Sequence, residues 1–316
     1  MKLLTLSSLS HRAVLTALLT VASPEALADP LDCAATPVSV GTQRVLALQN
    51  GGGSVVRAKM NINIDGSGRA YAKTNAAAGA LIHLCNAGEV FLADGTHYQG
   101  SESNATCSGK FMDDFRRIGE AGWKDPSVGA IRWFGILGRG SARIAGRTVN
   151  GVEPVEQAGA PGLYVSPTTL VDPSFPEDDL RRYPDPFTVP GGVVRQNATL
   201  QAAGVKIGTF GVALDVRRAS ASPVPFIVND YGPRVGEGTP ALARLVAGKA
   251  VKPDITRAER FVGLVDRDDV LWVFFGGAVL PPPFDAERVK TQAKAAFDAW
   301  GGEQRLQACV SATAPR

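Results

Sequence analysis

Histidine is scarce in this chain, with three residues in 316. His11 lies in an N-terminal segment that we expect to be removed, which leaves His83 and His97 for any histidine-based chemistry, and neither stands in a catalytic-triad motif. Net charge is also small, because 33 Lys and Arg residues oppose 30 Asp and Glu residues, and no stretch concentrates the basic ones. Proteins that bind nucleic acids usually concentrate basic residues on one face or helix, and this sequence does not, so we expect no nucleic-acid partner.

Long apolar runs are missing as well. The run at 13–22 has about ten residues, half of the roughly 20 that a membrane-spanning helix needs. It follows His11 and Arg12 and precedes the small residues Ala26 and Ala28, a pattern typical of a secretory signal peptide. We therefore expect a signal peptide at 1–28, no membrane span, and a secreted or periplasmic mature protein.

Cysteine is limited to four residues, and an even number in an exported chain favours disulfides in one of three connectivities. We favour Cys85 with Cys107, which would leave Cys33 with Cys309. The alternative is a zinc site that joins Cys85 and Cys107 to the two remaining histidines, His83 and His97, but this spacing matches no usual structural zinc pattern. We expect disulfides, no metal and no cofactor.

Glycine and proline are abundant, with 35 and 21 residues and no fixed period, which indicates many turns and short strands. Repeated alternation of strands and helices is absent, and this argues against a doubly wound parallel sheet. We expect a mainly β fold with short flanking helices, forming a single domain over 29–316.

Strict two-residue alternation over 55–65 predicts a half-buried strand. Its apolar face carries Val56, Ala58, Met60, Ile62 and Ile64. Its polar face carries Arg57, Lys59, Asn61, Asn63 and Asp65. A polar row of this kind faces either solvent or a groove, and the sequence alone favours solvent.

Other segments have equally clear local patterns. Apolar spacing predicts a helix over 108–123, with Ser108 as its cap, and another over 285–302 with a buried stripe that includes Val289 and Trp300. The consecutive apolar residues 226–228 predict a strand buried on both faces. Thr239 followed by Pro240 predicts the start of a helix that ends near residue 248.

Two carboxylates flank the glycine-containing loop that follows the strand at 226–228. Asp230 stands at the end of the strand and Glu237 just before the predicted helix. Hydrolysis of a glycosidic bond needs two carboxyl groups, roughly 6.5 to 9.5 Å apart for inversion or about 5 to 5.5 Å for retention. Desolvation would raise the pKa of Asp230, and the helix N-terminus would favour ionised Glu237, so we assign Asp230 as general acid and Glu237 as general base. Without further information, a turn-forming Asp and a helix-dipole Glu are the simpler interpretation.

The stretch DYGPRVGEGTPALA resembles the D-x-G-P and G-E-G-S/T segment of the glycoside hydrolase family 75 chitosanases. KMNINIDGSGRAY, GLYVSPTTLVDP, RYPDPFTVPGG and LWVFFGG resemble further family segments in the same order, over roughly residues 55 to 280. The resemblance implies that Asp230 and Glu237 are catalytic, that the core is a six-stranded double-psi-type β-barrel, and that the reaction inverts the anomeric centre. Asn61 and Asn63 stand where the family has aspartates, and the family pattern does not clearly cover residues 76–155.

From these observations we expect an exported, endo-acting hydrolase of β-1,4 linkages in chitosan or a related amino-sugar polysaccharide, acting as a monomer. We expect Asn61, Asn63, Asp65 and Tyr231 to bind the polysaccharide in a groove. Two alternatives remain: hydrolysis of peptidoglycan or another bacterial glycan, suggested by the missing groove aspartates, and non-catalytic glycan binding on the same barrel.

Overall fold

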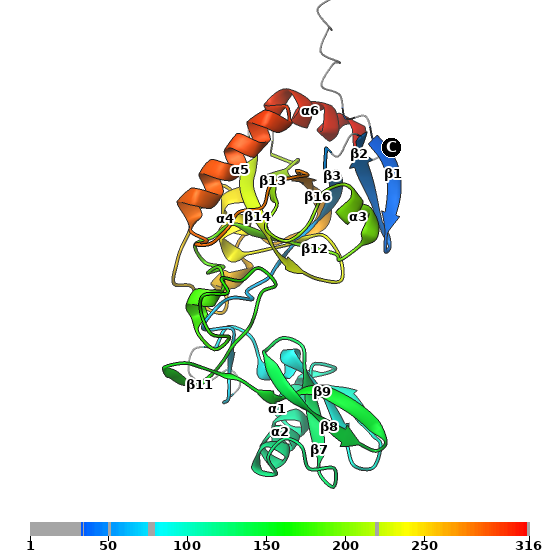
Figure 1. Cartoon of the computed structure of the whole chain (residues 1–316), viewed down its shortest axis with the longest axis vertical. Coiled ribbons are helices and arrows are strands. Elements are labelled where there is room, and N and C mark those ends of the chain that lie inside the picture. The colour runs from blue at the N-terminus through cyan, green and yellow to red at the C-terminus, as the bar shows by residue number, and fades with distance from the viewer. Residues whose placement is uncertain (1–32, 34, 50–51, 75–79, 219–220, 315–316) are drawn as a thin grey trace, which may run out of the picture.

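A computed structural model describes residues 33, 35–49, 52–74, 80–218 and 221–314 (Figure 1). The predicted signal peptide at 1–28 lies outside these residues. In the described part of the chain, no helix is long and apolar enough to cross a membrane.

The centre of the fold is a closed six-stranded barrel of mixed strand direction, which confirms the predicted mainly β barrel with flanking helices (Figure 1). Around the barrel the strands are β3 (Ser54–Ile62), β15 (Glu237–Gly238), β12 (Gly191–Val194), β14 (Val224–Tyr231), β13 (Phe210–Asp215) and β16 (Val265–Phe274). Antiparallel pairing of β16 with β3 closes the barrel. The pairs β3–β15 and β12–β14 are parallel, and the other neighbouring pairs are antiparallel.

Aromatic rings fill the barrel. Phe226 lies edge-on to Trp272 and to Phe274, with ring centroids 5.5 Å apart in both pairs. Glycines make room for these rings, since a Cβ atom on Gly192 or Gly211 would lie 2.7 Å or 2.5 Å from the Phe226 ring. With its interior packed, the barrel is a rigid scaffold, and chemistry belongs at its rim.

Helices and two further strands cover the outside of the barrel. β1 (Ala35–Val40) and β2 (Gln43–Leu48) extend the sheet beyond β3, and α5 (Ala286–Trp300) and α6 (Gly302–Ala312) pack over it (Figure 1). The predicted stripe of α5 is confirmed, because Val289 and Trp300 are both buried against the barrel. Asp285 caps this helix by accepting a hydrogen bond from the backbone N–H of Arg288 at 2.9 Å.

Both predicted disulfides are present. Cys33 is bonded to Cys309, and Cys85 to Cys107. The first joins the two ends of the described chain, and the second joins the 3-10 helix η3 (Leu84–Ala87) to α1 (Asn104–Ser108). The bonded cysteines are not available to the zinc site considered above, and no group of three or more His, Cys, Asp or Glu side chains among the described residues is placed to hold a metal ion.

Removal of the terminal disulfide should destabilise the protein. The bond spans 276 residues, whereas the Cys85–Cys107 bond spans 22, and closure of a longer loop restricts the unfolded chain more. We expect the Cys33→Ser/Cys309→Ser double variant to lose about 2–5 kcal/mol of unfolding free energy in urea titrations. Equal unfolding free energies for this variant and the wild type would contradict the prediction.

The region that the family pattern does not cover forms a separate lobe below the barrel in Figure 1. It contains β5 (Gly88–Leu92), β6 (His97–Gln99), β7 (Gly129–Trp133), β8 (Gly138–Ile144), β9 (Arg147–Pro154), α1 and α2 (Lys110–Glu120). The helix predicted over 108–123 is confirmed as α2, but its N-cap is Gly109 and not Ser108. Ser108 instead ends the unpredicted helix α1, which Ser103 caps by accepting from the Thr106 backbone N–H at 3.0 Å. Phe111 and Trp133 pack in a core that continues to Tyr71, next to the barrel.

Short elements connect the barrel and this lobe. β4 (Tyr71–Ala72), β10 (Glu156–Gln157) and β11 (Ala160–Tyr164) form a small sheet. The remaining short helices are η4 (Leu180–Arg182), α3 (Ala198–Ala202), α4 (Pro240–Val246) and η5 (Glu259–Phe261).

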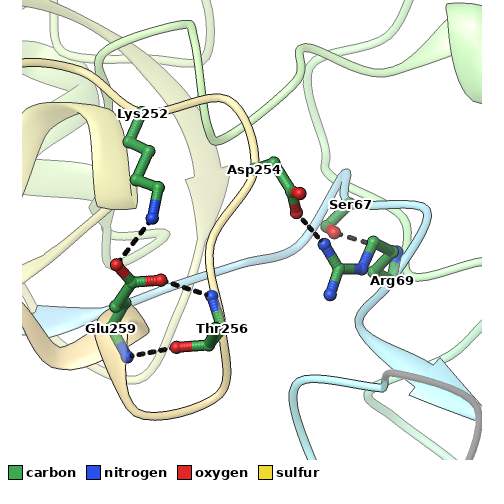
Figure 2. Close-up of polar contacts among 6 residues, drawn as sticks. All are labelled: Ser67, Arg69, Lys252, Asp254, Thr256 and Glu259. Carbon is green, nitrogen blue, oxygen red and sulfur yellow. Dashed lines mark hydrogen bonds and ion pairs between the residues drawn. The ribbon is translucent and has the colours of Figure 1, made fainter.

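Polar contacts fix the loop before η5 against the chain that leaves β3 (Figure 2). Asp254 pairs with Arg69, and Glu259 accepts from Lys252 Nζ at 2.6 Å and from the backbone N–H of Thr256 at 2.8 Å. The exposed Asp254–Arg69 pair joins the two segments, and the contacts of Glu259 order the loop itself.

Candidate active site

The strand order brings Asp230 and Glu237 to either side of β12. Val193 of β12 pairs with Asp230 of β14, and Gly192 pairs with Gly238 of β15. Continuing the antiparallel register by one residue places Glu237 level with Val193. Because neighbouring strands lie about 4.8 Å apart, the two carboxylate-bearing backbones are on the order of 10 Å apart. Side chains that converge from these positions can reach the two sides of one glycosidic bond.

Asp230 is buried, with 8% of its surface exposed. Its Oδ1 accepts three hydrogen bonds, from the Thr169 backbone N–H at 2.9 Å, the Thr169 hydroxyl at 2.6 Å and the Tyr231 backbone N–H at 2.8 Å. Burial raises the pKa of Asp230 above its ordinary value, and these hydrogen bonds oppose the rise because they favour the ionised form. The direction that the sequence predicted for this carboxyl is confirmed.

Glu237 differs from its prediction. The N-terminus of α4 is already capped by Thr239, whose hydroxyl accepts from the Leu242 backbone N–H, and Glu237 lies two residues outside it. Burial raises the pKa of Glu237, the charge of Asp230 raises it further, and Arg234 lowers it. The expected direction was wrong, because the pKa of Glu237 lies above its ordinary value and desolvation is the largest cause. Since both carboxyl groups have a raised pKa, the direction alone does not separate acid from base.

Asp65 brings a third carboxyl group into the site. The sequence favoured solvent for its row, yet burial and the charges of Asp230 and Glu237 raise the pKa of Asp65 to about 7. The Ser166 hydroxyl lies 2.6 Å from Asp65 Oδ1. Asp65 therefore exchanges its proton near neutral pH, and the solvent interpretation of this part of the row was wrong, because the chain folds over the end of β3.

Asn63 links two of the acids. It is only 8% exposed, and its Oδ1 accepts from the Asp65 backbone N–H at 2.7 Å. Side-chain hydrogen bonding by Asn63 lowers the pKa of both Asp65 and Asp230, which opposes the effect of burial on each. An amide is thus built into the space between two carboxyl groups, where a third acid would add repulsion.

Asn61 and Tyr231 also lie beside the carboxyl groups. Asn61 pairs in register with Glu237 across β3 and β15, and the backbone of Tyr231 contacts Asp230. Both side chains are partly exposed. Asn61, Asn63 and Asp65 are thus placed next to the predicted catalytic pair, whereas Tyr231 reaches Asp230 through its backbone and packs its ring against the barrel core. Contact of all four residues with a glycan stays a prediction.

The segment at 166–169 also belongs to the site, although the sequence did not predict this. Ser166 contacts Asp65 and Thr169 contacts Asp230, so one short stretch holds two of the three carboxyl groups. The Ser166 hydroxyl also lies 2.9 Å from the Gly135 carbonyl of the lobe below the barrel, which ties that lobe to the site. The available signal was the GLYVSPTTLVDP stretch, which contains both residues but was used for the resemblance alone.

The arrangement has the parts required for acid and base catalysis. The pKa values of all three carboxyl groups are raised, and the charges of Asp230 and Glu237 contribute to the rise at Asp65, so their titrations are coupled. No protein-family profile matches the chain, and no curated protein matches it either. A function for this chain is therefore inferred from the residues of the site and from the sequence motifs that contain them.

Proposed function

We propose that this chain is a glycoside hydrolase that cleaves β-1,4 bonds within an amino-sugar polysaccharide, with Asp230 and Glu237 as its catalytic pair. The observation that carries the proposal is the placement of these two carboxyl groups on either side of β12, close enough to Asp65 for both of their charges to raise its pKa. The two disulfides are compatible with a protein that acts outside the cytoplasm.

In the proposed reaction, the protonated member of the pair donates its proton to the oxygen of the leaving sugar. The ionised member removes a proton from the attacking water, which adds to the anomeric carbon from the opposite side. Oxygen and protons balance, because the water supplies both the new hydroxyl group and the proton that restores the acid. Thr169 and Ser166 hold their carboxylates in place for this step.

Chitosan is the first substrate to test, because the motifs that carry Asp230 and Glu237 resemble those of chitosanases. Purified mature protein should release new reducing ends from soluble chitosan or from peptidoglycan, measured by a colorimetric reducing-sugar assay. Binding to both polymers without any release would overturn the hydrolase and favour the non-catalytic glycan-binding alternative.

Peptidoglycan is the second candidate substrate of the same reaction. Neutral Asn61 and Asn63 stand where the chitosanase pattern has acids, which removes attraction for a polycation. Basic residues that form no ion pair within the described part of the chain also lie nearby, as described below. A higher rate on peptidoglycan than on chitosan, compared at equal sugar concentration, would favour this substrate.

Thr169→Val should change the pH dependence of the reaction. Loss of the hydroxyl removes a hydrogen bond of 2.6 Å that favours ionised Asp230, so the pKa of that carboxyl should rise further. We expect the limb of the kcat/KM profile that reports Asp230 to move to higher pH. Thr168→Val is the matched control, since the Thr168 hydroxyl donates to the Leu170 carbonyl instead. Identical profiles for Thr169→Val and the wild type would contradict the role of this contact.

A further inference from the structure

A basic cavity opens on the outer surface of the barrel, next to the candidate active site. Its volume is about 550 Å³, within the range of roughly 300–1,000 Å³ typical of ligand pockets. Its walls come from β2, β3, the loop at 231–236, β16 and the end of α6. No part of the proposed two-carboxylate reaction uses this cavity.

Four cationic side chains line the cavity: Arg44, Arg57, Lys59 and Arg234. The one acidic residue in its lining is Asp268. None of the ion pairs formed among the described residues involves any of these four cations. Positive charge gathered in a concave site without acidic partners favours an anionic ligand.

Two connections join this cavity to the carboxyl groups. Lys59 precedes Asn61 by two residues on the polar row of β3, a separation of roughly 7 Å along the strand, and Asn61 pairs with Glu237. Arg234 also acts at both places, since it lines the cavity and lowers the pKa of Glu237. A polymer that occupies the catalytic site can therefore extend into the cavity.

The loop that carries Arg234 is fixed in place. Gln43 Nε2 donates to the Val235 carbonyl at 2.8 Å, and the Val235 backbone N–H donates to Gln43 Oε1 at 2.8 Å. The Asn61 backbone N–H donates to the Gly236 carbonyl at 2.8 Å. Arg57 is held as well, because its Nε lies 3.3 Å from the Thr313 hydroxyl. A cavity that is built before the ligand arrives loses less conformational entropy on binding.

We propose that this cavity is a subsite for a carboxylate group carried by the glycan chain. The inference rests on the proposed glycoside hydrolase function and deepens it, because it selects carboxylate-bearing amino-sugar polymers over neutral or cationic ones. Arg44 and Lys59 bind the carboxylate by charge-assisted hydrogen bonds, and Arg234 lies between the bound group and Glu237. Peptidoglycan strands that have lost their stem peptides have this chemistry, since every second sugar of the β-1,4 chain then carries a free lactyl carboxylate.

The test compares two oligosaccharides of equal length by calorimetry at low salt. One alternates N-acetylglucosamine with N-acetylmuramic acid, and the other is a neutral N-acetylglucosamine oligomer. The binding host is the Glu237→Gln variant, so that cleavage does not interfere. We expect the carboxylated oligomer to bind roughly tenfold more tightly, as one charge-assisted hydrogen bond would provide, and this preference to weaken as salt rises.

Variants that remove positive charges test whether the preference for the carboxylated oligosaccharide arises in the cavity. Arg44→Gln/Lys59→Gln should lose it, whereas Arg143→Gln/Arg147→Gln, which removes two exposed charges from the lobe below the barrel, should keep it. Equal binding of the two oligosaccharides, or equal loss in both double variants, would overturn the subsite. The hydrolase proposal can fail independently of the subsite. In that case the wild-type protein would release no reducing ends but would still bind the carboxylated oligosaccharide more tightly.

Discussion

Asp230→Asn and Glu237→Gln should each lower kcat on the cleaved polysaccharide by roughly 10²–10⁴-fold, the usual contribution of a positioned acid or base. Each change keeps the shape of the side chain and removes its ability to exchange a proton at the working pH. Asn at position 230 can still accept from Thr169, so the strand end should stay in place. Initial rates of reducing-end release, with circular dichroism melting curves to verify folding, provide the measurement.

Matched controls are available for both substitutions. Asp172 accepts from the backbone N–H and the hydroxyl of Ser174 in an exposed loop, at 3.0 Å and 2.6 Å, which resembles the contacts of Asp230 without its burial. Glu303 is exposed on α6. Asp172→Asn and Glu303→Gln should retain wild-type rates. Full activity of a folded Asp230→Asn or Glu237→Gln variant would remove that residue from the catalytic pair.

Asp65→Asn should stabilise the protein at pH 8 by up to about 4 kcal/mol, while leaving its stability at pH 3 nearly unchanged. Folding raises the pKa of this carboxyl from an ordinary 3.8 to about 7. Below about pH 4 the folded and unfolded chains are both protonated here, so the group contributes nothing. Between about pH 4 and pH 7 the unfolded chain ionises first and stability falls, and above pH 7 the folded protein carries the full cost of a buried charge.

Urea unfolding of the wild type and the variant at pH 3, 5, 7 and 8 measures this difference. The gain in the variant should grow across the interval from pH 4 to pH 7 and then level off. Asp172→Asn is again the control, since the pKa of Asp172 is lowered by its hydrogen bonds to Ser174 and its substitution should not stabilise the protein at pH 8. A pH-independent difference between Asp65→Asn and the wild type would contradict a raised pKa at position 65.

Local patterns in the sequence predicted much of the fold. Alternation identified β3, and the Thr239–Pro240 pair identified the start of α4. The even number of cysteines predicted disulfides, and the favoured pairing of Cys85 with Cys107 left the correct second pair. These features depend on neighbouring residues or on simple pairing, so a linear reading can find them. Helix α1 was missed because its five residues, Asn104–Ser108, are too few to show a helical apolar period, and Cys107 is the one residue that it buries.

The site was harder to predict, because its properties depend on parts of the chain far apart in sequence. Ser166 and Thr169 come more than 60 residues from Asp65 and Asp230, respectively, so nothing local reveals their contacts. Separation in sequence also explains why the direction of the Glu237 pKa shift was predicted wrongly. A helix N-terminus two residues away is visible in the sequence, whereas the burial that raises the pKa of Glu237 arises only when β15 inserts between β3 and β12.

The most direct test of the account is the anomeric form of the first product. Proton NMR, recorded within minutes of adding the mature protein to a β-1,4-linked amino-sugar oligomer, distinguishes a new α reducing end from a β one before the two interconvert. The account predicts that the α form appears first, because the water and the leaving sugar are on opposite sides of the bond between Asp230 and Glu237. A β form that appears first, or absence of any new reducing-end signal from both chitosan and peptidoglycan oligomers, would contradict it.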